Sequence, residues 1–141
     1  MLAYIDTSTL LKLAINEVGS DQADTIWVSA DAVASVSLIT VEARAALAAA
    51  RRGNRITSSQ HESTRQELDA LIEELHIVEP TNELIAQAAT LAEVERLRGY
   101  DAVHLSSALV VGATILSSAD QGLCAAAQRR GFHVANPLDV P

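Results

Sequence analysis

Residues 1–13 read MLAYIDTSTLLKL, and this stretch decides how the rest of the chain is interpreted. A short apolar run ends on the carboxylate of Asp6, and the hydroxyl pair Thr7 and Ser8 leads into a second apolar segment. The run before Asp6 has the length of a buried strand, and the segment after it has helical spacing. Asp6 therefore either caps the following helix, as Thr7 or Ser8 could equally do, or it is one of several acids that meet at a metal ion.

The same pattern, a short apolar run followed by a helical segment, continues along the whole chain. We expect strands at 2–5, 32–36, 75–79, 113–117 and 133–135. We expect helices at 8–15, 21–29, 38–52, 58–74, 82–97, 102–111 and 120–130. Pro80 and Thr81 mark a helix start, whereas Gly99 and Gly131 are typical of positions where helices end. This alternation predicts one α/β domain over residues 1–141, a three-layer α/β/α sandwich with a mostly parallel central sheet of about five strands.

The composition is that of a globular protein. Of the 141 residues, 49% are hydrophobic and 20% are charged, which suits one domain with a single core. No apolar run approaches the roughly 20 residues of a membrane span, and we see no secretion signal at the N-terminus. The single cysteine, Cys124, excludes an internal disulfide and is expected to be a buried structural thiol. We therefore expect a cytoplasmic protein with no membrane partner.

The net charge of −8 argues against a protein that holds nucleic acid by general basicity, because that binding depends on Lys and Arg. The cations are nevertheless clustered. Arg44, Arg51, Arg52 and Arg55 lie within twelve positions, a cluster that we call the arginine edge. This edge either contacts phosphates or a partner, or it is only a solvated helix end. The single lysine is Lys12.

Four acids follow the predicted strands in a way that indicates a common site. Asp6 comes directly after the first strand and Asp120 after the fourth, while Glu42 lies one to two helical turns after the second. Asp101 opens the helix that precedes the fourth strand. Loops beyond the carboxyl ends of parallel strands converge where the strand order reverses. Three of the four acids therefore belong to this edge of the sheet.

Each acid also has a simpler interpretation. Asp101 and Asp120, like Asp6, are acceptable helix caps. Glu42 is more telling, because its helical neighbours three and four positions away are Leu38, Ile39, Ala45 and Ala46. It therefore projects from the apolar stripe, unless the helix is rotated so that the carboxylate is wet. We expect His104, one turn after Asp101, to be hydrogen-bonded inside the fold and not to be a ligand.

Taken together, the four acids favour a cation. Two carboxylates at ~4 Å repel by roughly 1–4 kcal/mol in surface-like surroundings, so either some are protonated or a divalent ion lies among them. An all-oxygen set without clustered His or Cys selects Mg²⁺ or Mn²⁺, and the one cysteine and four scattered histidines form no zinc set.

Four segments that carry these acids resemble a known family in order and approximate spacing. They are YIDTSTLLKL (4–13), SLITVEARAAL (37–47), RGYDAVHLSSAL (98–109) and ILSSADQGL (115–123). The chain resembles the PIN-domain family, and within it the VapC-type toxins of bacterial toxin–antitoxin pairs, over essentially its whole length. The resemblance implies that the acidic catalytic and metal-site residues are Asp6, Glu42, Asp101 and Asp120. It implies supporting roles for Ser8 and for Ser118, where many members have threonine.

The resemblance also implies an activity and partners. We expect a Mg²⁺- or Mn²⁺-dependent endoribonuclease that cleaves RNA, forms a homodimer and is silenced by a cognate antitoxin. One alternative is a catalytically inactive PIN-like binding scaffold. A receiver or phosphatase type is a second alternative, but it requires a lysine late in the chain, and the only lysine is Lys12.

Two further expectations concern surfaces. The Ala- and Leu-rich region 38–74 either offers an apolar groove to another chain or packs entirely within its own core. The few aromatic residues are expected in the core and not as a platform for bases; they are Tyr4, Trp27, Tyr100 and Phe132.

Overall fold

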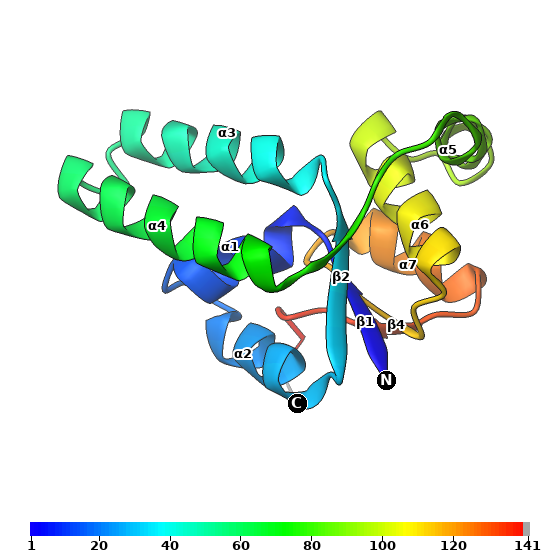
Figure 1. Ribbon diagram of the computed structural model, residues 1–141, viewed down its shortest axis with the longest axis horizontal. Coiled ribbons are helices and arrows are strands. Elements are labelled where there is room, and N and C mark those ends of the chain that lie inside the picture. Colours follow the sequence, from blue (N-terminus) through cyan, green and yellow to red (C-terminus); the bar gives the residue numbers. More distant parts are fainter. Residues whose placement is uncertain (140–141) are drawn as a thin grey trace.

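The computed structural model describes residues 1–139, and its centre is a sheet of five parallel strands (Figure 1). The strands are β1 (Leu2–Ile5), β2 (Ala32–Val36), β3 (His76–Val78), β4 (Ile115–Ser117) and β5 (His133–Ala135). They lie in the order β3-β2-β1-β4-β5. The bounds of β1, β2 and β5 are as predicted, whereas β3 and β4 are shorter than predicted.

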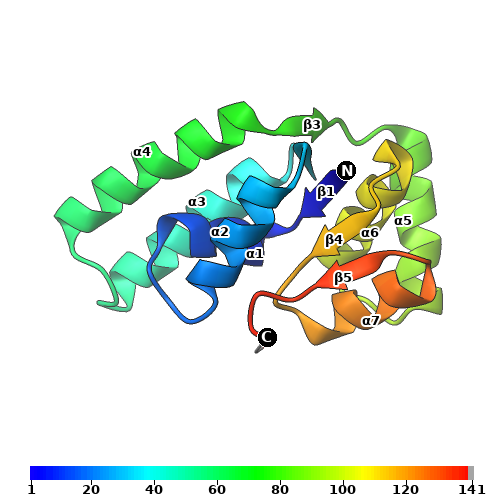
Figure 2. The ribbon, with the colours of Figure 1, turned by 90° about the horizontal axis from the view of Figure 1, so that it is seen from below.

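The helices form a layer on each face of this sheet (Figures 1 and 2). They are α1 (Thr7–Ala14), α2 (Ser20–Ser29), α3 (Ile39–Arg52), α4 (Ser58–Glu74), α5 (Asn82–Val94), α6 (Gly99–Val111) and α7 (Gln121–Arg129). Helices α1 to α4 cover one face and α5 to α7 cover the other. The predicted three-layer α/β/α sandwich with a parallel sheet is confirmed.

Two apolar clusters hold these layers together, and β1 contributes to both because successive side chains of a strand point to opposite faces. Tyr4 packs in the cluster under α5 to α7, with Leu105, Leu116 and Leu123. Ile5 packs in the cluster under α1 to α4, with Leu10, Leu47 and Leu68. Full burial of a leucine side chain contributes about 1.5–3 kcal/mol, so each cluster fixes its helix layer firmly.

The chain leaves the central strands β1 and β4 toward opposite faces. β1 leads into α1 and β4 leads into α7 (Figure 2). Their carboxyl ends lie side by side, because Ile5 pairs with Ser117 and the Asp6 N–H donates to the Ser117 carbonyl at 3.1 Å. Ligand sites of open parallel sheets form at such a reversal of strand order. We call this place the β1–β4 edge.

The connection between α5 and α6 departs from the prediction. Helix α5 ends at Val94, before the predicted end at 97, and Gly99 begins α6 instead of ending a helix. The stop is Arg96, at φ 56°, and the Leu97 N–H donates to the Ala92 carbonyl at 3.1 Å. This is the long hydrogen bond of a Schellman ending, with arginine where glycine normally lies. The prediction for Gly99 was wrong because an arginine gives no signal for the left-handed conformation.

Two other helix signals are confirmed. The Thr81 hydroxyl accepts from the Leu84 N–H at 3.1 Å and caps α5. Gly131 has φ 91° and follows the end of α7.

The half-buried Cys124 thiol lies 3.2 Å from the Ser118 carbonyl oxygen, and burial raises the pKa of the thiol to about 11. Among residues 1–139, no helix combines the length and the apolar character needed to cross a bilayer.

Candidate active site

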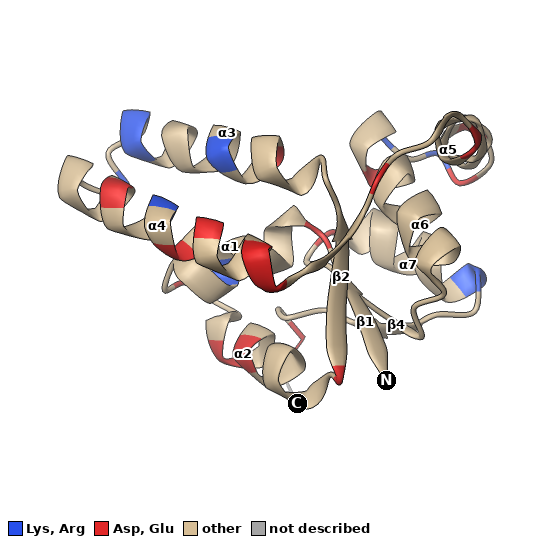
Figure 3. Ribbon diagram, in the orientation of Figure 1, with Lys and Arg blue, Asp and Glu red and all other residues tan. Residues whose placement is uncertain are grey.

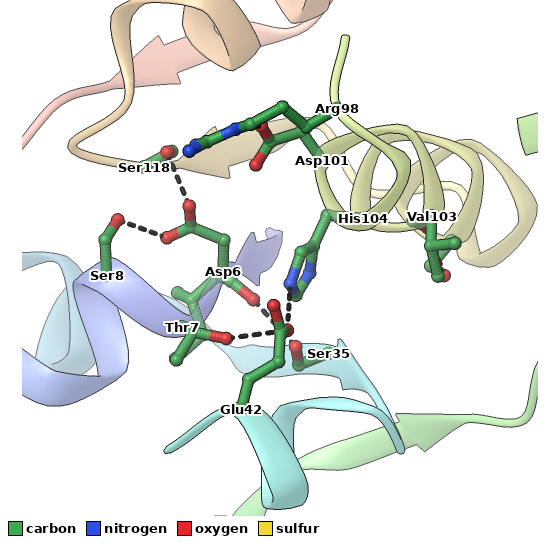
Figure 4. A network of polar contacts seen from close by, with 12 residues as sticks. Asp6, Thr7, Ser8, Ser35, Glu42, Arg98, Asp101, Val103, His104 and Ser118 are labelled. Atoms are coloured by element: carbon green, nitrogen blue, oxygen red, sulfur yellow. Dashed lines mark hydrogen bonds and ion pairs between the residues drawn. The ribbon is translucent and has the colours of Figure 1, made fainter. Parts of the chain in front are cut away.

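Asp6 stands directly after β1 and combines two roles. Its Oδ1 accepts from the Thr9 N–H at 3.1 Å, which caps α1, and from the Ser8 hydroxyl at 2.7 Å. Its Oδ2 accepts from the Ser118 hydroxyl at 2.6 Å (Figure 4). The cap interpretation is correct but incomplete, because the second oxygen faces the loop after β4.

The surroundings of Asp6 disfavour its charged form. The residue is 5% exposed, and burial raises the pKa of its carboxyl above the usual range, although His104, Ser118 and Ser8 act in the opposite direction. The three groups that donate hydrogen bonds to its oxygens are two hydroxyls and one N–H, and none of them carries a positive charge. An anionic Asp6 is therefore costly unless a cation compensates it.

Glu42 lies in the first turn of α3 and points toward Thr7 and His104 (Figure 4). Its Oε1 accepts from the Thr7 hydroxyl at 2.9 Å and from His104 Nε2 at 2.7 Å. Only 19% of the side chain is exposed, so the interpretation of Glu42 as a wet residue is wrong. Burial acts to raise the pKa of this carboxyl, but the contacts with His104 and Thr7 outweigh it and lower the pKa.

His104 holds Glu42 from the interior. The residue is 2% exposed, and its Nδ1 lies 2.7 Å from the Tyr4 hydroxyl at the opposite end of the ring from Glu42. Burial raises the pKa of the Tyr4 phenol, so the phenol keeps its proton and can donate it to Nδ1 of a neutral imidazole. Nε2 then donates to Glu42. Both ring nitrogens are used, which confirms the expectation that His104 is hydrogen-bonded inside the fold.

Asp101 and Asp120 share one guanidinium group. Arg98 Nε donates to Asp101 Oδ2 at 2.9 Å (Figure 4), and its Nη2 donates to Asp120 Oδ2 at 3.0 Å. Asp101 is the third residue of α6 and not its cap, so the cap interpretation is wrong there. It is correct for Asp120, whose Oδ1 accepts from the Leu123 N–H at 2.8 Å at the start of α7.

Two serines join the loop after β1 to the loop after β4. The Ser118 hydroxyl donates to Asp6 and accepts from the Asp120 N–H at 2.9 Å. The Ser8 hydroxyl donates to Asp6 and accepts from the Ala119 N–H at 2.9 Å. Each hydroxyl thus donates to a carboxylate and accepts from a backbone N–H, and together they fix the distance between the two loops.

The acids gather at the β1–β4 edge without forming a complete coordination shell. The three aspartates are linked through Ser118 and Arg98, and Glu42 joins them through Thr7, the residue after Asp6. In the described part of the chain, no three His, Cys, Asp or Glu side chains stand in an arrangement that would hold an ion directly. The grouping of the acids is therefore observed, and the metal site stays a prediction.

The donor atoms at this edge nevertheless fit a hard divalent cation. All candidate ligand atoms are carboxylate oxygens, which Mg²⁺ and Mn²⁺ prefer. Glu42 Oε2 and Asp101 Oδ1 accept no hydrogen bond from residues 1–139, since the contacts of these side chains use the other oxygen. An ion held through these atoms would break neither the cap of α1 nor the cap of α7.

Sequence reasoning missed two residues of this edge. Arg98 was noted only as a clustered cation, and His104 was set apart from the acids. For Arg98 a signal was present, because it lies three residues before Asp101 and residues at this spacing are neighbours on a helix. For His104 there was none, because its acid partner Glu42 lies sixty-two positions away on another helix.

An apolar groove of about 380 Å³ adjoins Glu42. It is lined by Thr7, Leu38, Val41, Glu42, Ala45, Ala46 and Tyr100. Val41 is 59% exposed and Tyr100 is 62% exposed. The expectation that Tyr100 belongs to the core is therefore wrong, whereas Tyr4 and Phe132 are buried as predicted.

The arginine edge is only partly engaged within the chain. Arg44 Nη2 donates to both carboxylate oxygens of Asp69 on α4, at 3.0 and 2.9 Å. No ion pair of Arg51, Arg52 or Arg55 is present among residues 1–139, and all three are exposed. Arg51 and Arg52 end α3 and Arg55 follows in the next loop, and Figure 3 shows basic residues at this end of the helix. These three cations remain available to another molecule.

The fold and the acidic edge together define the class of protein. It is an α/β sandwich whose carboxylates follow the first and fourth strands in the chain. The family model described as PIN domain matches residues 3–128, and the chain belongs to this family. Within the family, the chain is 39% identical over 132 residues to two proteins of Mycobacterium tuberculosis, Ribonuclease VapC45 and Ribonuclease VapC49. Each match covers 94% of this chain and 87% of the relative.

Solved structures share the fold at lower sequence identity. PAE2754 from Pyrobaculum aerophilum superposes with a TM-score of 0.71 at 21% identity, over 96% of this chain and 92% of the other. VapC20 from Mycobacterium tuberculosis, described as a sarcin-ricin loop cleaving toxin, gives a TM-score of 0.69 at 16% identity, over 93% and 96%. These similarities confirm the architecture.

Proposed function

We propose that this protein is a Mg²⁺- or Mn²⁺-dependent endoribonuclease and the toxin of a toxin–antitoxin pair. The observation that carries the proposal is the gathering of acids from four chain segments at the β1–β4 edge. The names of the two curated relatives, both ribonucleases, support the activity. Like charges kept together without a catalytic task would only cost stability.

In this proposal the cation is held by Asp6, Glu42, Asp101 and Asp120. The bound ion supplies two things: it lowers the pKa of a coordinated water, and it stabilises charge on the scissile phosphate and the leaving oxygen. The protein then needs no side-chain nucleophile. Ser8 and Ser118 act on the site indirectly, because they keep the Asp6 carboxylate in one orientation.

The remaining steps belong to the side chains of this protein. Thr7 and His104 hold Glu42 Oε1, so that Oε2 remains for a ligand. Whichever of Asp101 and Asp120 is not bound to the ion orients or deprotonates the attacking water, which requires a carboxylate within hydrogen-bond reach of that water. Both are more exposed than Asp6, with 13% and 34% of their side chains accessible, as contact with water and RNA demands.

RNA must reach an acidic protein, and the arginine edge supplies the cations for this. Arg51 and Arg52 are exposed and, in the described chain, free of ion pairs, so they can neutralise phosphates of an approaching strand. Reversing both charges, R51E with R52E, should weaken RNA cleavage or antitoxin binding, measured at two salt concentrations. If neither changes, this edge has no role in binding.

The partners follow from the same proposal. We expect a cognate antitoxin and a homodimer, because exposed apolar side chains such as Val41 and Tyr100 suit contact with another chain. Sedimentation of the purified protein tests the dimer. Capture of the product of a neighbouring gene tests the antitoxin.

The central experiment is incubation of the purified protein with total cellular RNA and Mg²⁺, followed by mapping of the cut ends. We expect cuts at defined positions, no cuts in excess chelator, and a loss of about 10³-fold in Asp6→Asn, in line with removal of a group that acts directly in catalysis. Asp24→Asn, at an exposed position of α2, is the matched control and should cut normally. Intact RNA with the wild-type protein, or equal cutting by Asp6→Asn, would refute the proposal and favour an inactive scaffold.

A further inference from the structure

Arg98 is the one arginine of the described chain that contacts the candidate catalytic acids. Its guanidinium spans two carboxylates on different elements, Asp101 on α6 and Asp120 at the start of α7. Both contacts are made to the Oδ2 atoms, at 2.9 and 3.0 Å. Asp120 Oδ1 is already used to cap α7, so its Oδ2 is the oxygen that a ligand would take.

A divalent cation and this guanidinium therefore compete at Asp120, because Oδ2 is its one oxygen outside the cap of α7 and Arg98 already occupies it. At Asp101 an ion could use the free Oδ1, but the guanidinium on Oδ2 would repel it. Occupation of the site by a metal ion requires that Arg98 release at least one of its partners.

Arg98 has the most exposed side chain among the ion-paired arginines of residues 1–139. Its side chain is 77% exposed and has no other hydrogen-bond partner among residues 1–139. By contrast, Arg129 and Arg130 both bind Glu95, whose side chain is 7% exposed. An exposed ion pair contributes little free energy, so the release of Arg98 costs little.

The chemistry of the released group points to a phosphate. A guanidinium presents a planar fork of donors that matches the oxygens of a phosphate, and lysine cannot reproduce it. Arg98 directly precedes α6 and lies beside the acids, so a short rotation of its side chain keeps it at the rim of the site. An RNA backbone that approaches the metal would pass within its reach.

We propose that Arg98 is a substrate-binding residue that changes partners during the reaction cycle. It pairs with Asp101 and Asp120 before metal binding, releases them on metal binding, and then contacts a phosphate of the RNA. This inference rests on the proposed nuclease function and deepens it. It predicts that loss of the arginine strengthens metal binding and weakens RNA binding.

The first test is a calorimetric titration of the RNA-free protein with Mn²⁺. Arg98→Gln should bind Mn²⁺ about three- to tenfold more tightly than the wild type, since a weak competing ion pair is removed. Arg96→Gln is the control. It removes one exposed positive charge two positions away that has no ion pair within residues 1–139, and its Mn²⁺ affinity should stay within about twofold.

The second test is the KM for RNA at saturating Mn²⁺. Arg98→Gln should raise KM by about tenfold or more, as expected for loss of a charge-assisted hydrogen bond. Arg98→Lys, which keeps the charge but not the fork, should recover only part of the affinity for RNA. Arg96→Gln should leave KM unchanged.

The outcomes separate this inference from the function on which it rests. Unchanged or weaker Mn²⁺ binding in Arg98→Gln overturns it, and so does tighter Mn²⁺ binding with an unchanged KM. In both cases a wild-type protein that binds Mn²⁺ and cuts RNA leaves the nuclease proposal intact. A wild-type protein that neither binds Mn²⁺ nor cuts RNA overturns both.

Discussion

The acidic edge has an inner half, Asp6 and Glu42, and an outer half, Asp101 and Asp120, and the two are held in different ways. The inner acids are 5% exposed for the whole residue of Asp6 and 19% for the side chain of Glu42. Their oxygens are held by hydroxyl, N–H and imidazole groups. The outer acids are not uniformly more exposed, since their side chains are 13% and 34% accessible, but both are held by one arginine whose side chain is 77% exposed.

This difference indicates a division of labour. Buried hydrogen bonds hold a group in one geometry, and their loss leaves unpaired polar atoms in the interior. Exposed ion pairs hold a group loosely and exchange readily with water and ions. The inner half therefore fixes the place of the site, while the outer half can rearrange when ligands bind.

The largest expected effect is at His104, the support of the inner half. His104→Ala should destabilise the protein by about 3 kcal/mol, because it removes one hydrogen-bond partner each from the Tyr4 hydroxyl and Glu42 and opens a cavity. His133→Ala, at an exposed position of β5, should change stability by less than about 0.5 kcal/mol. The free energies of unfolding of the variants are compared by urea denaturation, with a chelator present so that no metal ion contributes. Equal effects at both positions would show that the inner half is no more firmly held than the surface.

A smaller loss of stability is expected at Tyr4, which contacts the end of the His104 ring that faces away from Glu42. Tyr4→Phe removes only the hydroxyl that lies 2.7 Å from His104 Nδ1, and should cost about 1–2 kcal/mol. Tyr100→Phe is the matched control at a position that is 62% exposed, and it should be close to neutral. The same denaturation curves give both values. A neutral Tyr4→Phe would mean that the Tyr4–His104 contact does not stabilise the site.

The two inner acids should respond to pH with opposite signs. The pKa of Asp6 is raised by burial, so the stability that its protonated form provides is present at low pH and is lost as the pH rises through that raised pKa. Asp6→Asn should therefore be more stable than the wild type at pH 7 in chelator, and this advantage should vanish below about pH 4.

The pKa of Glu42 is lowered on balance, with His104 and Thr7 outweighing burial. Its contribution to stability is present at neutral pH and is lost as the pH falls through its lowered pKa. Glu42→Gln should thus be less stable than the wild type at pH 7 and approach it in acid. Thermal unfolding from pH 3 to 8 checks both variants, and shifts of the same sign would contradict the account.

The smallest effect is expected in the outer half. Arg98→Gln should unfold at the same temperature as Arg96→Gln in chelator, because the Arg98 side chain is 77% exposed and water can replace its contacts. A clear loss of stability confined to Arg98→Gln would show that the arginine is a fixed structural element. Its proposed exchange between the acids and RNA would then be untenable.

The sequence predicted the architecture well because the signals were local. Short apolar runs marked all five strands, and Thr81 and Gly131 marked helix ends by well-understood backbone chemistry. The failure at Gly99 has an equally local cause. Arginine at position 96 takes a left-handed conformation, which its residue type does not signal.

The site was predicted less completely, because its contacts are long-range. The acids could be assigned to one edge by chain order alone. The Tyr4–His104 contact joins residues one hundred positions apart, and the Arg98–Asp120 pair spans twenty-two. Such pairings depend on how helices pack over the sheet, and no periodicity in the sequence reports them.

The most direct test of the central claim is the Mn²⁺ dependence of the melting temperature of the wild type and Asp6→Asn. A site formed by these carboxylates predicts that the wild type gains about 2.7 kcal/mol at an ion concentration one hundred times Kd. Asp6→Asn should begin from a higher melting temperature at pH 7 and gain nothing. An equal gain in both proteins, or no gain in the wild type, would show that the acids at the β1–β4 edge do not bind a divalent ion.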